Sequence, residues 1–130
     1  MTRIAAKLVV AAAIVGATVL PLSATNPGTR APRRVDVVID AHMGHFTPRV
    51  IRVHRGDTVH VTMRAMDAAH GFKVQGMENV DVTAYPGMPT EVTFVADWVG
   101  GREWFCTFNC GPRHGSMTGM ITVVRDEEQL

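Results

Sequence analysis

Short runs of apolar and β-branched residues, broken by polar ones, follow one another along most of the chain. Turn-forming pairs such as Gly56-Asp57, Pro86-Gly87 and Gly100-Gly101 separate the runs. Strands at short, regular spacing are typical of an antiparallel sandwich or barrel. The expected strands are residues 35–40, 50–53, 57–63, 71–74, 80–83, 90–95 and 119–124. No long helical period occurs in this region, so the pattern predicts an all-β domain.

The first 24 residues have a different pattern. Arg3 and Lys7 precede an uncharged apolar run from Leu8 to Leu22, and the small residues Ser23-Ala24 follow it. The run suits the apolar region of a signal peptide, although a count that starts further back gives a marginal membrane span. We therefore expect residues 1–24 to be either a cleaved signal peptide or a membrane anchor. Both place the rest of the chain outside the cytoplasm, in the periplasm or on the outer face of the cell membrane.

Residues 25–34 are rich in proline and glycine and have no apolar periodicity, which predicts a linker. The all-β domain is then expected to cover residues 35–130. The whole chain of 130 residues is 46% hydrophobic and 19% charged, as in globular proteins. The formal net charge of +1 gives no electrostatic reason to expect nucleic acid as a partner.

Four residues with metal-binding side chains lie close together near the C-terminus. They are Cys106, Cys110, His114 and Met117, and the two cysteines are the only ones in the chain. In an exported protein, a cysteine pair by itself indicates a disulfide first. However, thiolate, imidazole and thioether together form the donor set that selects copper, whereas methionine is a poor ligand for zinc. The loop therefore predicts a copper site.

A further ligand is expected from a neighbouring loop. His70 is the best candidate, because it follows an expected strand after a short polar turn and should lie at one end of the sandwich. His54 and His60 follow a strand-like alternation and are expected to be exposed. The segment from His42 to His45 has metal-binding side chains as well, but a solvated turn is the preferred interpretation.

Three segments together resemble the CuA domain of cytochrome c oxidase subunit II, particularly the short type with a single membrane helix. They are F-T-P-R-V-I-R-V-H-R-G-D-T-V, A-A-H-G-F-K-V and C-T-F-N-C-G-P-R-H-G-S-M. The resemblance covers nearly all of residues 46–124. It implies a cupredoxin Greek-key β-sandwich that holds two copper ions in a binuclear CuA centre.

The resemblance also implies a role for each ligand. Cys106 and Cys110 would bridge both copper ions, and His70 and His114 would each bind one of them. Met117 would be a weak ligand, and the backbone carbonyl of Phe108 would be another. Packing of the neighbouring aromatic residues, Trp104, Phe105 and Phe108, is expected to keep the centre dry.

Such a protein would relay electrons from a donor such as cytochrome c to a membrane oxidase, in contact with oxidase subunit I, or to a related reductase. We expect no catalysis by this chain itself, because no acid and base pair is apparent. One residue departs from the pattern: subunit II usually has Glu where this chain has Phe108. The family's magnesium contact would then be lost, and the usual docking to an oxidase core is in question. Nitrous oxide reductases also have an aromatic residue at this place.

Two other functions fit the residues less well. A mononuclear blue-copper carrier would use Cys110, His114, Met117 and His70, but it needs only one thiolate, so Cys106 argues against it. A copper-delivery or storage protein would gain some support from the eight methionines, although these are scattered along the chain.

Overall fold

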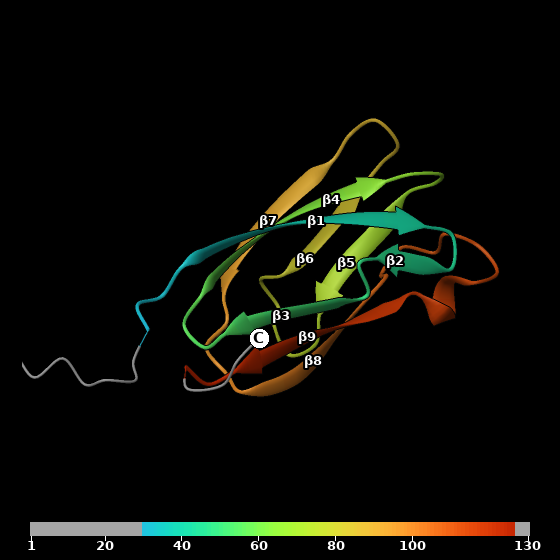
Figure 1. The fold of residues 1–130 in the computed structure, drawn as a ribbon. Coiled ribbons are helices and arrows are strands. Elements are labelled where there is room, and N and C mark those ends of the chain that lie inside the picture. Colours follow the sequence, from blue (N-terminus) through green and yellow to red (C-terminus); the bar gives the residue numbers. More distant parts are fainter. Residues whose placement is uncertain (1–29, 127–130) are drawn as a thin grey trace, which may run out of the picture.

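The computed structural model describes residues 30–126, which form a two-layered β-sandwich (Figure 1). The predicted leader and most of the predicted linker lie outside the described residues. The strands are β1 Arg34–His42, β2 His45–Thr47, β3 Val50–His54, β4 Thr58–Ala65, β5 His70–Val74, β6 Asp81–Ala84, β7 Thr90–Val95, β8 Gly100–Phe105 and β9 Thr118–Val124. A short 3-10 helix, η1, spans His114–Ser116. Within residues 30–126, no helix is long and apolar enough to cross a membrane.

One sheet has the strand order β2-β1-β4-β7 and the other has the order β3-β9-β8-β5-β6. The chain passes from one sheet to the other several times, as in a Greek-key sandwich. The sequence pattern predicted an antiparallel sandwich, but two strand pairs are parallel. Strand β1 pairs with β4, and β3 pairs with β9, in parallel. Parallel neighbours arise here because the chain crosses to the other sheet between the two strands of each pair.

Most strands follow the predicted alternation. In β4, for example, every second side chain from Val59 to Ala65 is buried, because successive side chains point to opposite faces of a sheet. Strands β2 and β8 were not predicted. The interpretation of Gly100-Gly101 as a turn was wrong, since both residues open β8. The sulfur of Met120 lies 2.8 Å from where a Cβ of Gly101 would be, so only glycine fits there without rearrangement.

Trp104 lies at the centre of the core and is fully buried. Its ring contacts Phe46 at a centroid distance of 6.1 Å and Phe72 at 5.7 Å. A Cβ at Gly119 would come within 2.2 Å of the same ring, so this glycine lets β9 pass close to the indole. Trp104 is the last residue but one of β8, directly before Phe105 and the cysteine loop. The packed indole therefore fixes the point at which that loop leaves the sheet.

The two ends of the sandwich differ in what they carry. We call the end where β1 and β4 begin the Asp57 end, and the end to which they point the cysteine end. Figure 1 shows the chain arriving at the first of these ends, with the β1–β2 hairpin and η1 at the second. A nine-residue strand such as β1 spans roughly 27 Å between its first and last residues.

Candidate metal centre

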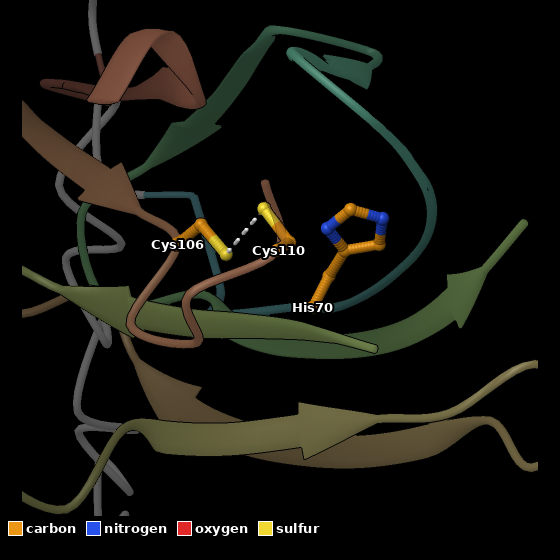
Figure 2. Close-up of side chains that lie close together, drawn as sticks. All are labelled: His70, Cys106 and Cys110. Carbon is orange, nitrogen blue, oxygen red and sulfur yellow. Dashed lines mark hydrogen bonds between the residues drawn. The ribbon is translucent and has the colours of Figure 1, made fainter. Parts of the chain in front are cut away.

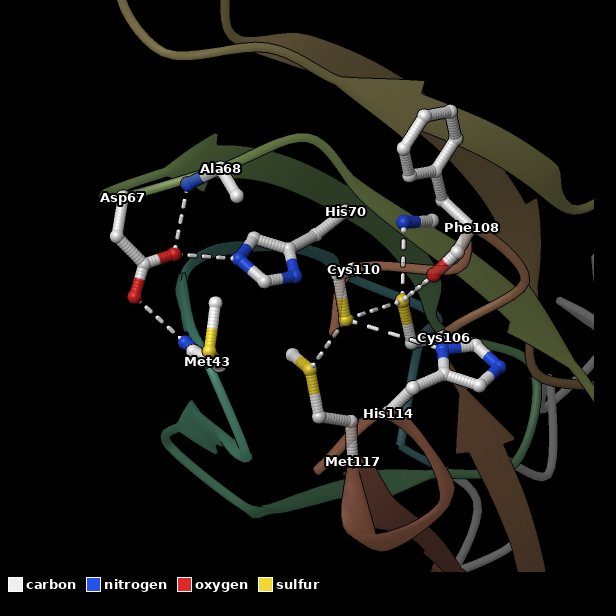
Figure 3. Close-up of polar contacts among 10 residues, drawn as sticks. Met43, Asp67, Ala68, His70, Cys106, Phe108, Cys110, His114 and Met117 are labelled. Carbon is white, nitrogen blue, oxygen red and sulfur yellow. Dashed lines mark hydrogen bonds and ion pairs between the residues drawn. The ribbon is translucent and has the colours of Figure 1, made fainter. Parts of the chain in front are cut away.

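His70 is the first residue of β5, and its side chain is completely buried. The carboxylate of Asp67 lies 2.7 Å from Nε2 of His70 and also accepts the backbone N–H groups of Met43 and Ala68 (Figure 3). A carboxylate can only accept, so Nε2 carries a proton, and in the neutral ring Nδ1 then has the free lone pair. Nδ1 is buried and has no hydrogen-bond partner among residues 30–126.

The two cysteine side chains face the imidazole of His70 (Figure 2). Their sulfur atoms are 3.7 Å apart, and both thiols are free. One ligand atom each from His70, Cys106 and Cys110 lies within 4.8 Å of the other two. An unpartnered buried nitrogen is costly in a folded protein unless something binds it, and here it adjoins two sulfur atoms.

Cys106 follows β8 directly and contacts the backbone on two sides. Its sulfur lies 3.3 Å from the amide nitrogen of Gly71, which donates to it, and 3.1 Å from the carbonyl oxygen of Phe108. Gly71 is required for this approach, since a Cβ there would lie 2.2 Å from Oγ1 of Thr107. The H-G-F segment of β5 and the cysteine loop are therefore in direct contact.

Cys110 has the largest number of possible ligands around its sulfur. Sδ of Met117 lies 3.3 Å away and Nδ1 of His114 lies 3.8 Å away (Figure 3). Helix η1 brings His114 and Met117 back toward Cys110, because the N–H of Met117 bonds to the carbonyl of His114. One sulfur therefore adjoins a thiol, an imidazole and a thioether.

Burial and hydrogen bonding together shift the pKa values of Cys110 and Asp67 in the metal-free protein. Burial and the neighbouring thiol of Cys106 raise the pKa of Cys110 to about 11, so this side chain is a neutral thiol at neutral pH. For Asp67, burial alone would raise the pKa, but the hydrogen bonds from His70, Met43 and Ala68 outweigh it and lower the pKa below its usual value. Asp67 is therefore a negative charge beside Nε2 of His70.

The donor set is that of a copper site. Two sulfurs that can become thiolates, two imidazole Nδ1 atoms, one thioether and one carbonyl oxygen meet at the cysteine end. Soft sulfur and imidazole ligands select copper rather than magnesium or calcium. The free lone pair on His70 Nδ1 is what such an ion requires, and Asp67 holds the ring in that state.

The structure brings together all six residues that the sequence analysis selected, namely His70, Cys106, Phe108, Cys110, His114 and Met117. Two expectations about the exposure of other side chains were wrong. The ring of Phe108 is 40% exposed and packs against Tyr85, so it does not shield the cysteines. His54 and His60 are half-buried rather than exposed, and Nδ1 of His60 lies 2.8 Å from Oγ1 of Thr93 on the neighbouring strand.

Sequence reasoning missed Asp67 and Gly71 as parts of this centre. Asp67 stands three residues before His70, a spacing that lets a loop carboxylate turn back to the ring. Gly71 follows the histidine directly, and that position was the only sign of its steric role.

No protein-family model matches the chain. Comparison of the fold with solved structures gives a TM-score of 0.58 with auracyanin A, a blue copper protein of Chloroflexus aurantiacus, at 20% identity over 70% of this chain and 99% of that one. The periplasmic domain of subunit II of the cytochrome oxidase of Bradyrhizobium japonicum gives 0.57 at 23% identity, over 69% of this chain and 85% of that one. The described domain has the cupredoxin fold.

Sequence comparison supports the narrower resemblance. Cytochrome c oxidase subunit 2 of Thermus thermophilus is 29% identical over 92 residues, which are 71% of this chain and 67% of the relative. Nitrous-oxide reductase of Stutzerimonas stutzeri is also 29% identical, over 78% of this chain but only 16% of that protein. A chain in a heme-copper terminal oxidase dimer gives a TM-score of 0.67 at 26% identity, over 72% of this chain and 66% of that one. The predicted similarity of this cupredoxin domain to the CuA domain of subunit II is thus confirmed.

Proposed function

We propose that this protein is an electron-transfer protein whose six residues at the cysteine end hold two copper ions in a CuA-type centre. The observation that carries the proposal is a second thiol, Cys106, only 3.7 Å from Cys110 and close to the unpartnered Nδ1 of His70. A blue-copper site needs a single thiolate, so the second sulfur favours a shared, two-ion centre. The similarity to oxidase subunit 2 and to nitrous-oxide reductase supports the same choice.

Copper held by Cys106, Cys110 and the neighbouring ligands would supply one-electron redox chemistry. The protein's part is to hold the ligands in fixed positions, so that gain or loss of an electron moves them little. Asp67 fixes the His70 ring, Gly71 donates its N–H to the sulfur of Cys106, and η1 positions His114 and Met117. Low exposure of both cysteines keeps water away from the sulfurs.

We further propose that the protein works outside the cytoplasm, with a donor such as cytochrome c and a membrane oxidase or related reductase as acceptor. The similarity to oxidase subunit 2 and to a chain in a heme-copper oxidase dimer supports an oxidase-type partner. Phe108 provides a carbonyl oxygen next to Cys106. It has no carboxylate for the magnesium contact that the resemblance to subunit II would otherwise imply. The exposed ring of Phe108 gives this chain an apolar surface at the position where subunit II usually has a charged Glu. A partner that docks there would therefore meet an apolar side chain.

A copper count combined with absorption and electron paramagnetic resonance spectra tests the proposal. We expect two copper ions per chain and a hyperfine pattern from one unpaired electron shared by two equivalent nuclei. One ion with a blue absorption band would instead indicate a mononuclear carrier. A protein that stays colourless and spectroscopically silent as Cu(I) after treatment with an oxidant would indicate delivery or storage. Either result would contradict the proposed centre.

A further inference from the structure

Four of the six residues proposed as copper ligands are closed off from solvent, whereas His114 is half-buried and Phe108 is exposed. Cys106 is 4% exposed, Cys110 is 6% exposed, and the side chains of His70 and Met117 are completely buried. A hydrated ion must lose its water before it binds these four buried ligands. Donors at the surface beside the loop would hold the ion during that step.

The β1–β2 hairpin carries three such donors. His42 and His45 are direct cross-strand partners, and their rings stack at a centroid distance of 4.9 Å with an interplanar angle of 6°. Side chains at paired positions of a hairpin have Cβ atoms about 5 Å apart, so two imidazoles can converge on one ion after small rotations. Between them in the sequence stands Met43, a thioether that is 37% exposed on the same turn.

The tip of this hairpin rests on the metal loop. A Cβ at Gly111, next to Cys110, would lie 3.3 Å from the sulfur of Met43. A Cβ at Gly44 would meet the side chain of Arg113 at 2.8 Å, and the hydroxyl of Ser116 donates to the carbonyl of Gly44. Figure 3 shows the thioether of Met43 on the same side of the loop as His70.

We propose that His42, Met43 and His45 form a surface copper-acquisition site that receives the ion before the buried centre does. This inference rests on the proposed function of the buried residues. Imidazole and thioether bind copper, but thiolate binds Cu(I) more strongly, so an ion held at the hairpin passes inward by exchange of ligands. With Cu(I) no electron is transferred, and each thiol that becomes a ligand releases one proton to solvent.

Binding at the hairpin is tested in full-length protein in which Cys106→Ser and Cys110→Ser remove the buried thiols. Competition with a chromogenic Cu(I) chelator measures the affinity for Cu(I). Adding His42→Gln and His45→Gln should weaken Cu(I) binding at least about tenfold, or about 1.4 kcal/mol. The matched control, His54→Gln with His60→Gln, removes two histidines elsewhere and should leave the affinity unchanged. Equal affinities in the two quadruple variants would overturn the proposal.

Delivery is tested with the cysteines intact and reduced. We expect Met43→Leu, and His42→Gln with His45→Gln, to slow copper uptake from a Cu(I)-glutathione donor several-fold, while the final copper content and spectrum stay as in the unmodified protein. Unchanged uptake rates would refute acquisition through the hairpin. Failure of the unmodified protein to take up copper would contradict the buried centre, whereas the chelator competition would still report on the hairpin.

Discussion

The two ends of the sandwich each bury one charged or polar side chain, but they satisfy it differently. At the Asp57 end, the carboxylate accepts the backbone N–H groups of Arg33 and His54 and pairs with the guanidinium of Arg30. At the cysteine end, His70 has a partner for one ring nitrogen and none for the other within residues 30–126. Both carboxylate oxygens of Asp57 therefore have partners within the protein, whereas the imidazole of His70 has one ring nitrogen that could bind a ligand.

This difference separates stability from function. Breaking a fully partnered buried group leaves uncompensated polar atoms and costs folding free energy. A buried nitrogen without a partner lowers the folding free energy gained by the metal-free protein. An ion that binds this nitrogen in the folded state restores that stability. Changes at the Asp57 end should therefore affect unfolding, and changes at the cysteine end should affect metal content.

The largest effect is expected from Cys106→Ser. Loss of the second sulfur should abolish the paired centre and leave at most one copper, on Cys110, with no shared-electron signal. Copper analysis and electron paramagnetic resonance measure this. Thr107→Ser, one residue further along the loop, is the control and should keep both ions. Two coppers with an unchanged spectrum in Cys106→Ser would show that the ligand assignment is wrong.

Asp57→Asn should have the largest effect on stability. The amide keeps the shape but loses the charge that faces Arg30, and one of its two terminal groups cannot accept the N–H donors around it. We expect a loss of about 3 kcal/mol in the free energy of unfolding, measured by denaturant titration of the metal-free protein. Copper content should be unaffected at concentrations where the variant is folded. The exposed Asp36 provides the control as Asp36→Asn, which should change stability little.

Gly71→Ala is predicted to disturb the cysteine end by steric overlap. The new Cβ would lie 2.2 Å from Oγ1 of Thr107 and 2.9 Å from the amide nitrogen of Phe108, so the loop must move away from β5. We expect weaker copper binding and an altered absorption spectrum. Gly115→Ala lies in η1, where no atom stands within 4 Å of the new Cβ, and should leave both unchanged. Identical spectra for the two variants would mean that close contact between β5 and the loop is not needed.

Asp67→Asn should have a smaller effect on the same centre. The amide can turn its NH2 group toward Nε2 of His70, which would favour the wrong tautomer of the ring. Loss of such an orienting group typically weakens metal binding about 10- to 100-fold. Copper competition titration measures the change, and Asp67→Glu is a useful companion because it keeps the charge. No loss of affinity in Asp67→Asn would remove the orienting role.

The smallest expected effect is the pH dependence of the stability that Asp57 provides. For Asp57, burial alone would raise the pKa, but the hydrogen bonds from Arg33, Arg30 and His54 outweigh it and lower the pKa below 3.8. A group with a lowered pKa in the folded state stabilises the fold above its unfolded pKa and loses that contribution as pH falls through the folded value. The stability difference between the unmodified protein and Asp57→Asn should therefore shrink as pH falls from about 5 toward 3. A difference that stays constant over this range would contradict the lowered pKa.

Much of the fold and of the donor set could be predicted from the sequence, because both depend on local patterns. Alternation identified strands such as β4, and the spacing from Cys106 to Met117 identified a loop with copper-type donors. Parallel pairing could not be predicted, since it depends on which sheet the chain crosses to. Strand β8 was hidden by its opening glycines, whose role depends on Met120 of β9. Asp67 and the exposed ring of Phe108 were missed because loop geometry, rather than periodicity, decides which way they face.

The Arg30–Asp57 pair also determines from which end the domain would be held. Residues 25–29 are all that separate the predicted membrane segment from this fixed point, and five residues reach at most about 18 Å when fully extended. The proposed copper ligands lie beyond the far end of β1, roughly 27 Å further along the sandwich. If residues 1–24 remain in the membrane, the domain would be held at its Asp57 end, and the proposed copper centre would lie at the opposite end. In that arrangement, a membrane-bound partner would need a part that extends above the bilayer surface to reach the proposed centre.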